Sequence, residues 1–310
     1  MTWPRLDYAA DHGTYETLHL MTQIVGKTRL AATPWVNHGW QVALYVTPRG
    51  LSTSAMPHGE GVLDLEFDFI DGVLRGRTSD GASASLPLAA QPIADFHAAY
   101  LAMLDGLGVS LAIDGAPNEI PDPVPFAQDT RPRAYDPEAA RRLWRVLIIA
   151  NHQFGLFRTA FLGKASPVHF FWGSFDLATT RFSGRRAPLH PGGVPHLPDA
   201  VTREAYSHEE WSAGFWPGGP ETPYAMFYAY AYPEPVGFRA APGLPAEARF
   251  DETLGEYVLP YDRVAAAADG QSVVQAFLSA TYGAAADGGG WDRATLECGI
   301  GRPRIPRAVG

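Results

Sequence analysis

The stretch "GVLDLEFDFIDGVLRGRTSDGASASLPL", residues 61–88, decides the fold class. Its first half alternates apolar residues with Asp64, Glu66 and Asp68, which is the period of a strand with one packed and one wet face. Asp-Gly pairs at 71–72 and 80–81 then interrupt the pattern, and such pairs between apolar runs signal tight hairpin turns. The stretch therefore predicts antiparallel strands, and we interpret its acidic stripe as a solvated sheet face.

Helical patterns flank these strands. In residues 14–32 the apolar side chains recur about every 3.6 residues, which predicts a helix with Thr14 as its N-cap. Residues 92–108 predict a second helix that begins at Pro92. The same order of elements returns after the midpoint. There we predict a helix over 136–164 capped by Asp136, strands over 168–182, 209–216, 224–232 and 248–261, and a helix over 270–286.

The two halves also echo each other locally. "GKTRLAATPWVNHGWQVALYVTPRG" (26–50) can be laid over "GKASPVHFFWGSFDLATTRFSG" (163–184), from the Gly-Lys pair through a histidine to an arginine. We therefore expect an α+β fold of two similar halves, each helix – antiparallel strands – helix, related by an internal pseudo-twofold duplication. The predicted boundaries are an N-terminal half over 1–115, a Pro-rich linker over 116–135 and a C-terminal half over 136–310.

Composition excludes several classes of protein. The chain of 310 residues has a net charge of −9 and no block of basic residues, so we expect no nucleic-acid partner. Its start lacks the pattern of a signal peptide, and its longest apolar run, "VLIIA" (146–150), predicts no membrane span. The single cysteine, Cys298, leaves no intrachain disulfide, which favours the cytoplasm. The oligomeric state is not predicted.

The aromatic stretch "SPVHFFWGSFDLATTRFSGR" (166–185) holds the first candidate site residues. If its strand is unbroken, His169 and Arg181 share one face, while Trp172 and Asp176 lie on the other. A bulge at Gly173 would turn His169 and Asp176 to the same face, still separated by roughly 20 Å of strand. Any catalytic partner of His169 must then come from another part of the chain.

Our first hypothesis is an enzyme or ligand-binding protein with a polar and aromatic pocket between the halves. Arginine suits the binding of anions and histidine suits proton transfer near neutral pH, so we expect a small polar or anionic ligand and metal-independent acid–base chemistry without a cofactor. The predicted catalytic residues are His169, His38 and Asp176. The predicted substrate-binding residues are Arg181, Arg49, Trp172, Trp40, Tyr230, His208 and Glu209.

Other interpretations stay open beside this one. In one of them the stretch is an ordinary core sheet, in which His169 and Asp176 bond to neighbouring backbone and Arg181 pairs with an acidic residue of the 64–68 stripe. The "FYAYAY" strand (227–232) places its tyrosines on one face, as a non-catalytic protein-binding or assembly module could use. A metal-dependent enzyme would combine two histidines with a carboxylate such as Glu209 or Glu210, although no His-x-x-x-His spacing supports one.

Several long phrases are specific enough to indicate a family. They are "TYETLHLMTQIVGK", "LYVTPRGLST", "FDFIDG", "SPVHFFWGSFDLATTRFSGR", "EAYSHEEWSAGFWPGG" and "FYAYAYPEP". Through them the chain resembles a bacterial family of uncharacterised proteins, a domain of unknown function, over nearly its whole length. The resemblance implies a stand-alone bacterial cytosolic protein, and it supplies no activity, cofactor or catalytic residue.

Overall fold

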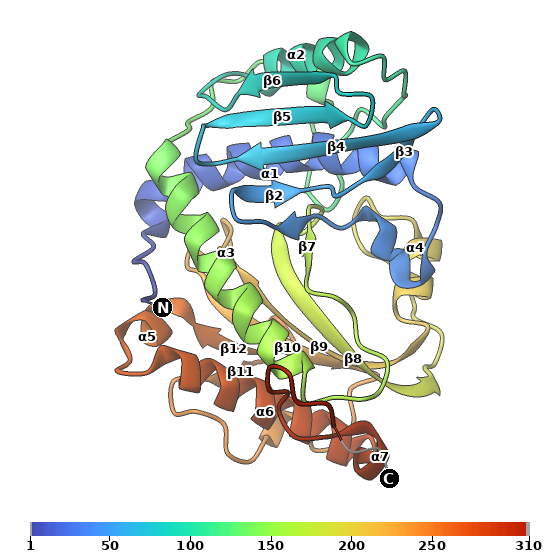
Figure 1. Cartoon of the computed structure of the whole chain (residues 1–310). Helices are drawn as coiled ribbons and strands as arrows, with labels where there is room; N and C mark the ends of the chain where they lie inside the picture. The colour runs from blue at the N-terminus through green and yellow to red at the C-terminus, as the bar shows by residue number, and fades with distance from the viewer. Residues whose placement is uncertain (1, 308–310) are drawn as a thin grey trace.

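The structure, a computed structural model, describes residues 2–307. It mixes helices with two six-stranded antiparallel sheets, which confirms the α+β class and the antiparallel strands (Figure 1). The outer ends of the two predicted halves, residue 1 and residues 308–310, lie outside the described residues. One contiguous cluster of buried apolar side chains contains residues of both predicted halves, among them Leu65 and Trp211.

The N-terminal sheet has the spatial order β1-β2-β4-β5-β6, and β3 pairs with the start of β4. The two Asp-Gly hairpins form as predicted, because Gly72 and Gly81 adopt φ angles of 68° and 98° that other residues rarely accept. The strands are β1 (Tyr45–Val46), β2 (Gly50–Ser52), β3 (Met56–His58), β4 (Gly61–Asp68), β5 (Val73–Thr78) and β6 (Ser83–Pro87).

The C-terminal sheet has the order β11-β12-β10-β9-β8-β7. Two of its strands match the predicted ranges closely, whereas the predicted strand over 248–261 is a hairpin of two short strands. The strands are β7 (His169–Phe171), β8 (Asp176–Arg186), β9 (His208–Trp216), β10 (Met226–Tyr232), β11 (Arg249–Asp251) and β12 (Glu256–Pro260).

Helices cover the sheets and join them. In Figure 1, α1 runs behind the N-terminal sheet, and α3 runs diagonally from that sheet towards the C-terminal one. The α-helices are α1 (Tyr8–Ala32), α2 (Ile93–Gly106), α3 (Pro137–Arg158), α4 (Asp199–Ala205), α5 (Tyr261–Ala266), α6 (Gly270–Gly288) and α7 (Arg293–Leu296). Short 3₁₀ helices are η1 (Asn37–Val42), η2 (Phe126–Gln128) and η3 (Phe238–Ala240).

Helix ends follow the predicted caps in one case and not in the other. The Asp136 side chain accepts a hydrogen bond from the Glu138 N–H and begins α3, as predicted. Thr14 is not an N-cap: α1 begins at Tyr8, and the Asp7 side chain caps it by accepting from the Ala10 N–H. The helix continues through Gly13 because its first turns pack against the rest of the chain, which outweighs the weak propensity of one glycine.

The predicted strand over 168–182 is wrong, because the chain forms a hairpin there. Residues 172–175 make a turn between β7 and β8, closed by a 2.8 Å hydrogen bond from the Phe175 N–H to the Phe171 carbonyl. Phe175 takes a φ of 62°, which reverses the chain. His169 pairs with Ala178 and Phe171 pairs with Asp176, so His169 and Asp176 share a face. In this register they are diagonal neighbours about 7–8 Å apart rather than about 20 Å.

The two sheets meet through their edge strands. Leu44, just before β1, and Phe170 in β7 exchange two backbone hydrogen bonds of 2.9 and 2.8 Å. Both side chains are buried, so the bridge joins the sheets through the core. The segment between α2 and α3, which contains the predicted linker, is also packed, since the Phe126 side chain is fully buried.

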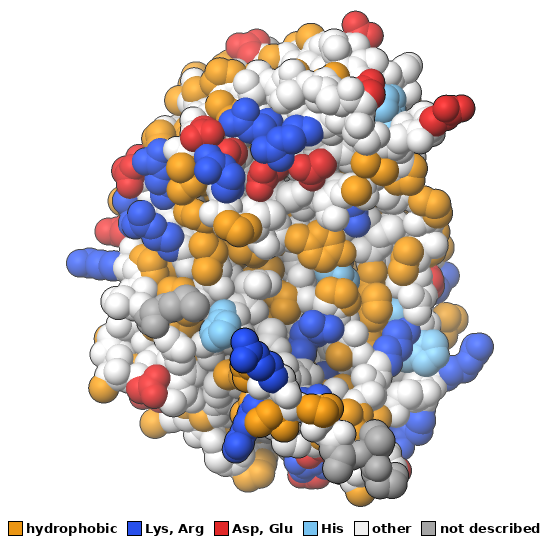
Figure 2. All heavy atoms as spheres, viewed as in Figure 1, with side chains coloured by type: hydrophobic (Ala, Val, Ile, Leu, Met, Phe, Trp, Pro, Cys, Tyr) orange, Lys and Arg blue, Asp and Glu red, His pale blue; other side chains and the backbone are white. Residues whose placement is uncertain are grey.

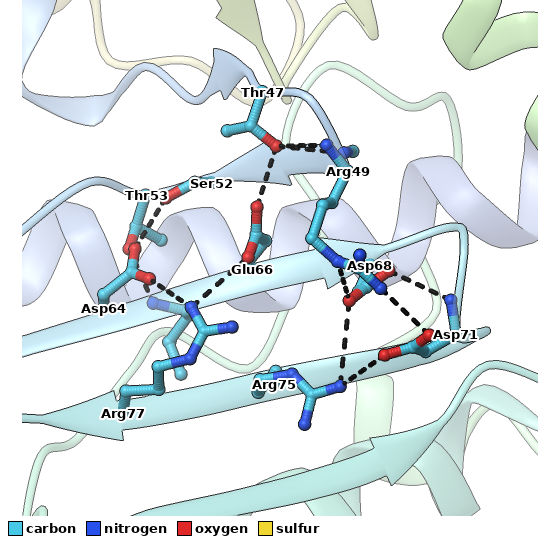
Figure 3. A network of polar contacts seen from close by, with 12 residues as sticks. Thr47, Arg49, Ser52, Thr53, Asp64, Glu66, Asp68, Asp71, Arg75 and Arg77 are labelled. Carbon is cyan, nitrogen blue, oxygen red and sulfur yellow. Dashed lines mark hydrogen bonds and ion pairs between the residues drawn. The ribbon is translucent and has the colours of Figure 1, made fainter. Parts of the chain in front are cut away.

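The acidic stripe of β4 carries an ion-pair network instead of a freely solvated face (Figure 3). Asp68 is fully buried, accepts a 2.6 Å hydrogen bond from Arg49 Nε, and lies 3.7 Å from an Arg75 nitrogen. The backbone N–H groups of Ile70 and Asp71 also donate to it. Although burial opposes ionisation, these donors hold the pKa of Asp68 below its usual value. The stripe therefore pairs with the arginines of its own sheet and not with Arg181.

We expect Asp68→Asn to lower the free energy of unfolding by about 2–3 kcal/mol at pH 7, because it leaves guanidinium groups without their buried counter-charge. A depressed carboxyl pKa stabilises the fold above the unfolded value and loses that contribution as the pH falls. Urea unfolding at pH 7 and pH 4 measures both effects. The control is Asp71→Asn, whose half-exposed carboxylate binds the same arginines and should cost below about 1 kcal/mol. Equal costs for the two variants would contradict this assignment.

Candidate functional site

One face of the C-terminal sheet packs on α3 and α6, and the other carries a row of polar and aromatic side chains. Strand register places Tyr228, Tyr230 and Tyr232 on this second face, as their alternation predicts. Asp176, Glu210 and Glu256 lie on the same face, and none of these side chains is freely exposed. We call this surface the polar face of the C-terminal sheet.

Asp176 is the centre of the polar face. It is 6% exposed, and it accepts hydrogen bonds from the Ser174 hydroxyl and from the Tyr228 hydroxyl. Tyr228 reaches it from β10 by crossing the middle strand at Gly214, where a Cβ would lie 2.3 Å from the tyrosine oxygen. Glycine at this position therefore lets the two side chains meet. Burial raises the pKa of Asp176, while its two hydrogen bonds lower it less strongly.

Glu119 approaches Asp176 from the loop between α2 and α3. A Cβ on Gly173 would lie 2.0 Å from Glu119 Oε1, so this carboxyl group rests directly against the turn of the β7–β8 hairpin. The backbone of Glu119 has a φ of 58°, a conformation that costs energy for a residue with a side chain. The neighbouring Asn118 supplies the anchor that holds it there.

Helix α1 provides that anchor through side chains spaced four residues apart. Gln23 forms two hydrogen bonds with the backbone of Asn118, of 2.8 and 2.7 Å, and the Lys27 ammonium donates to the Asn118 side chain. His19 bonds through Nε2 to the Gly173 carbonyl at 2.8 Å. The same helix face thus holds both the Glu119 loop and the hairpin turn, and it fixes their relative position.

Three carboxyl groups of the polar face are unusually basic. Burial and the nearby Asp176 raise the pKa of Glu119 to about 7, and burial, Asp176 and Asp251 raise that of Glu256 to about 7. Burial raises the pKa of Glu210 to about 8, against the opposing charge of Lys164. Within residues 2–307 none of the three carboxyl groups has a hydrogen-bond partner. Buried polar groups are nearly always partnered, so these three are available to a ligand or to water.

A lysine–histidine pair lies beside Glu210. Lys164 Nζ is 2.5 Å from His38 Nε2, and His38 Nδ1 is 2.8 Å from the Ala205 carbonyl. Since that carbonyl can only accept, His38 carries its proton on Nδ1, and Nε2 accepts from the Lys164 ammonium. Burial and the charges of Lys164 and His208 keep the pKa of His38 low, outweighing the bond to Ala205, so the imidazole is neutral at pH 7.

The comparison with family models identifies the chain at the level of a family. A model described as "Family of unknown function (DUF5996)" matches residues 3–298. The chain belongs to this family. No curated protein and no solved structure matches it. The DUF5996 match confirms the resemblance over nearly the whole chain, and it carries no known activity.

The predicted histidines of this DUF5996 protein come together only in part. Trp40 lies between them, with ring centroids 5.0 Å from His38 and 5.7 Å from His169. His208 joins them from the start of β9, at 5.8 Å from His38. His169 is 1% exposed and its Nδ1 has no partner among the described residues. Burial, with the charges of Arg158 and Arg29, lowers the pKa of His169 to about 4.

The two predicted arginines do not reach the polar face. Arg181 lies on the opposite side of β8, enclosed by the rings of Phe157, Phe161 and Tyr282, and it donates to the Phe157 carbonyl. Arg49 is bound to the ion-pair network of the N-terminal sheet. Arg181 and Phe182 are adjacent in β8 and therefore point to opposite faces of the strand. Because Phe182 packs on His38, the arginine and this histidine lie on opposite sides of the sheet.

Three of the remaining predicted residues are placed differently from one another. Tyr230 lies on the polar face, where its hydroxyl is 3.1 Å from that of Tyr206. Glu209 points away from it and binds Arg185 with an ion pair of 2.6 Å. Trp172 lies in the hairpin turn and donates a 2.9 Å hydrogen bond to the Val42 carbonyl, so it ties the turn to η1.

Sequence reasoning missed Glu210, Glu119 and Glu256 as members of the site. Alternation from His208 could have indicated Glu210, because residues two apart in a strand share a face. Nothing in the Pro-rich segment around Glu119 indicates that its loop folds back onto a hairpin 54 residues further along the chain. Glu256 follows a turn in a segment with a weak strand pattern, and nothing in the sequence distinguishes it from an ordinary surface glutamate.

Three further observations concern the surroundings of this site in the DUF5996 protein and other kinds of site in the chain. A hollow of about 270 Å³ lies between residues 5–9 and 223–225, and none of the predicted site residues lines it. Among residues 2–307, no three or more histidine, cysteine, aspartate or glutamate side chains are grouped so that they could hold a metal ion. No helix in that range is both long and apolar enough to cross a bilayer.

Proposed function

We propose that this DUF5996 protein is an enzyme that performs acid–base chemistry on a small polar molecule at the polar face of the C-terminal sheet. The observation that carries the proposal is the placement of Glu119 and Glu256 around Asp176. Neighbouring carboxyl groups in a poorly solvated region resist simultaneous ionisation, so protonated and ionised carboxyls coexist near pH 7. A general acid and a general base are then both present at the working pH.

The free carboxyl groups also indicate the chemistry of the ligand. Glu119, Glu210 and Glu256 make no hydrogen bond within the described part of the chain. When ionised they only accept, and when protonated each also has one O–H to donate. A ligand rich in O–H or N–H donors, such as a polyol or an amine, would satisfy them. The stacked rings of Tyr228 and Tyr230, 6.3 Å apart, offer such a molecule a flat wall. The anionic ligand of the sequence hypothesis has less support here, because neither predicted arginine lies on this face.

A thermal-shift screen against small polyols, amines and sugars, followed by mass-spectrometric detection of product, tests the proposal. We expect Glu119→Gln and Glu256→Gln each to lower kcat about 100-fold or more, because the loss of a general acid or base has that size. Asp176→Asn should shift the pH optimum, since it removes the charge that acts on both groups.

The matched control is Glu209→Gln, which removes a carboxylate that faces Arg185 outside the polar face. It should leave turnover and binding unchanged. If the Glu119 and Glu256 variants keep full turnover of a substrate that binds, acid–base catalysis at this face is refuted. Binding that depends on these carboxyls without any turnover would instead make the protein a ligand-binding module.

We also propose that the two halves arose by internal duplication and that the protein works in the cytoplasm. Each half contains a long helix followed by an antiparallel sheet, and the sheets meet at their first strands, which supports duplication. Against it, His38 lies in a 3₁₀ helix and its sequence counterpart His169 in a strand. The single cysteine, free and half-buried, agrees with a reducing compartment.

A further inference from the structure

Lysine is rare in this chain, which draws attention to the positions where it occurs. The sequence has 22 arginines and two lysines, Lys27 and Lys164. The chain thus supplies nearly all of its positive charge with guanidinium groups, which stay protonated throughout the physiological pH range. A lysine amine differs, because it becomes a nucleophile when it loses its proton. Amine chemistry is therefore available from these two side chains and not from the arginines.

The two lysines have different surroundings. Lys27 is 2% exposed and donates to the side chain of Asn118, so it is enclosed where α1 holds the loop that carries Glu119. Lys164 lies in the segment between α3 and β7 and is exposed. Within residues 2–307 no carboxylate oxygen lies within 4.0 Å of the Lys164 ammonium group. Lys164 is therefore the lysine that a molecule from solvent can reach.

Aromatic rings and a neutral imidazole surround the Lys164 nitrogen. Its Nζ lies 5.3 Å from the centroid of the Trp40 ring and 4.9 Å from the centroid of the Phe182 ring. It is also 2.5 Å from Nε2 of His38. The other ring nitrogen of His38 donates to the Ala205 carbonyl, so the imidazole presents a lone pair to the lysine. The amine therefore has a proton acceptor beside it.

Glu210 lies next to this amine. It is the cross-strand partner of Phe182, so the two side chains share the polar face with their Cβ atoms about 5 Å apart. The Phe182 ring thus borders both the ammonium group and the buried carboxyl group. Because the pKa of Glu210 is about 8, this carboxyl group is protonated at pH 7. Loss of hydration lowers the pKa of Lys164, against the opposing charges of Glu210 and Glu204.

We call Lys164, His38, Trp40, Phe182 and Glu210 the Lys164 cluster. Its members come from both parts of the fold, since His38 and Trp40 lie in η1 before the N-terminal sheet, whereas Phe182 and Glu210 lie in the C-terminal sheet. In Figure 2, basic and histidine side chains emerge among hydrophobic ones in the region where the two sheets meet, with few acidic neighbours. The surface there agrees with an amine that is open to solvent and lacks an ion-pair partner.

We propose that Lys164 forms an imine with the carbonyl group of a small hydroxylated aldehyde or ketone. The hydroxyl groups of such a molecule find partners nearby, because Tyr230 lies diagonally across β9 and β10 from Glu210 and its hydroxyl is 3.1 Å from that of Tyr206. The site goes beyond the acid–base proposal and is separate from it. Six residues of β8, or roughly 20 Å of strand, lie between Asp176 and the Phe182 ring.

The groups of the Lys164 cluster can complete this reaction without a further reagent. The lysine first releases its proton to solvent. Its nitrogen then attacks the carbonyl carbon, and the carbonyl oxygen takes the proton of Glu210. The nitrogen next passes a proton to Nε2 of His38, which returns it to the new hydroxyl group as that group leaves as water. The products are a protonated imine, one water molecule and the Glu210 carboxylate, which balances the charge of the imine.

Reductive trapping of the whole chain tests this site. Glycolaldehyde and dihydroxyacetone are the probes, and sodium cyanoborohydride reduces an imine to a secondary amine. The modified lysine then gains the mass of the probe less one oxygen atom, and peptide mapping by mass spectrometry locates it. We expect at least one probe to label Lys164 about tenfold or more faster than it labels free Nα-acetyllysine at pH 7, because free lysine has neither an acid nor a base beside it. Lys27 is the internal control and should stay unlabelled.

Variants separate a built site from chance modification of an exposed amine. Glu210→Gln and His38→Gln should each slow the labelling of Lys164 about tenfold or more, because each removes a proton-transfer group. Glu209→Gln is the matched control and should label as the parent does, since its carboxylate faces Arg185. If His38→Gln fails to fold, Glu210→Gln decides.

Two results would overturn the proposal. One is labelling of Lys164 by both probes no faster than that of Nα-acetyllysine. The other is a Glu210→Gln protein that is labelled as fast as the parent. Glu119→Gln should leave the labelling unchanged, because this carboxyl group lies outside the Lys164 cluster. The imine site and the acid–base proposal can therefore fail separately, and the same set of variants tells the two failures apart.

Discussion

Gly26→Ala is expected to destabilise the protein by about 2–3 kcal/mol, although alanine is the better helix former. A Cβ on Gly26 would lie 2.2–2.3 Å from three atoms of the Trp172 indole. That ring is buried and cannot retreat without breaking its hydrogen bond to the Val42 carbonyl. Helix α1 would have to move away from the β7–β8 turn, and the cost of overpacking exceeds the gain in helix propensity. Chemical unfolding followed by circular dichroism measures the difference.

Gly155→Ala is the matched control, because the same substitution is expected here to raise the free energy of unfolding instead of lowering it. Gly155 lies inside α3, and a Cβ there meets no other atom within 4 Å. We expect it to stabilise the protein by about 0.5–1 kcal/mol through helix propensity alone. If both variants are stabilised, Trp172 does not constrain α1, and the placement of the helix against the hairpin turn is wrong.

Part of the secondary structure could be predicted because it depends on residues that are neighbours in the sequence. The Asp-Gly hairpins and the Asp136 cap depend on one or two residues, and each was predicted correctly because no distant contact competes with it. The aromatic stretch was misread because its turn contains one glycine and no Asp-Gly or Asn-Gly pair. Phe175 adopts a positive φ there. The hairpin imposes this conformation, and it could not be predicted because phenylalanine rarely adopts it.

Fewer residues of the candidate site could be predicted, because the site depends on contacts between segments that are distant in the sequence. His38, His208 and Tyr230 are predicted from the sequence for a pocket between the halves, and in the structure they lie on or beside the polar face. It could not place Glu119, which reaches Asp176 only through the side chains of α1. The arginines show the same limit: alternation says that Arg181 and Phe182 face opposite ways, but not which face is the core.

Glu210 makes the pH dependence of stability itself a test of the polar face. It is 6% exposed. The positive charge of Lys164 lowers its pKa against the effect of burial, and the hydroxyl groups of Tyr206 and Tyr230 also interact with it. Its pKa of about 8 in the folded state lies far above that of an unfolded glutamate. Between these two values the folded protein holds a proton that the unfolded chain has released. Stability therefore falls as the pH rises from about 5 to 8 and levels off above the folded pKa.

Glu210→Gln removes this proton and should flatten the profile by up to about 1.4 kcal/mol per pH unit between pH 6 and 8. At pH 8.5 the variant should be more stable than the parent by on the order of 2–4 kcal/mol, while the two should be nearly equal at pH 5. A slope remains, because Glu119 and Glu256 titrate in the same direction. Glu209→Gln is one residue away but faces Arg185, so it should keep the parent slope. A Glu210→Gln profile parallel to that of the parent would mean that Glu210 is ionised in the folded protein. The polar face would then be well solvated, and the carboxyl groups beside Asp176 would lose their reason to hold protons at neutral pH.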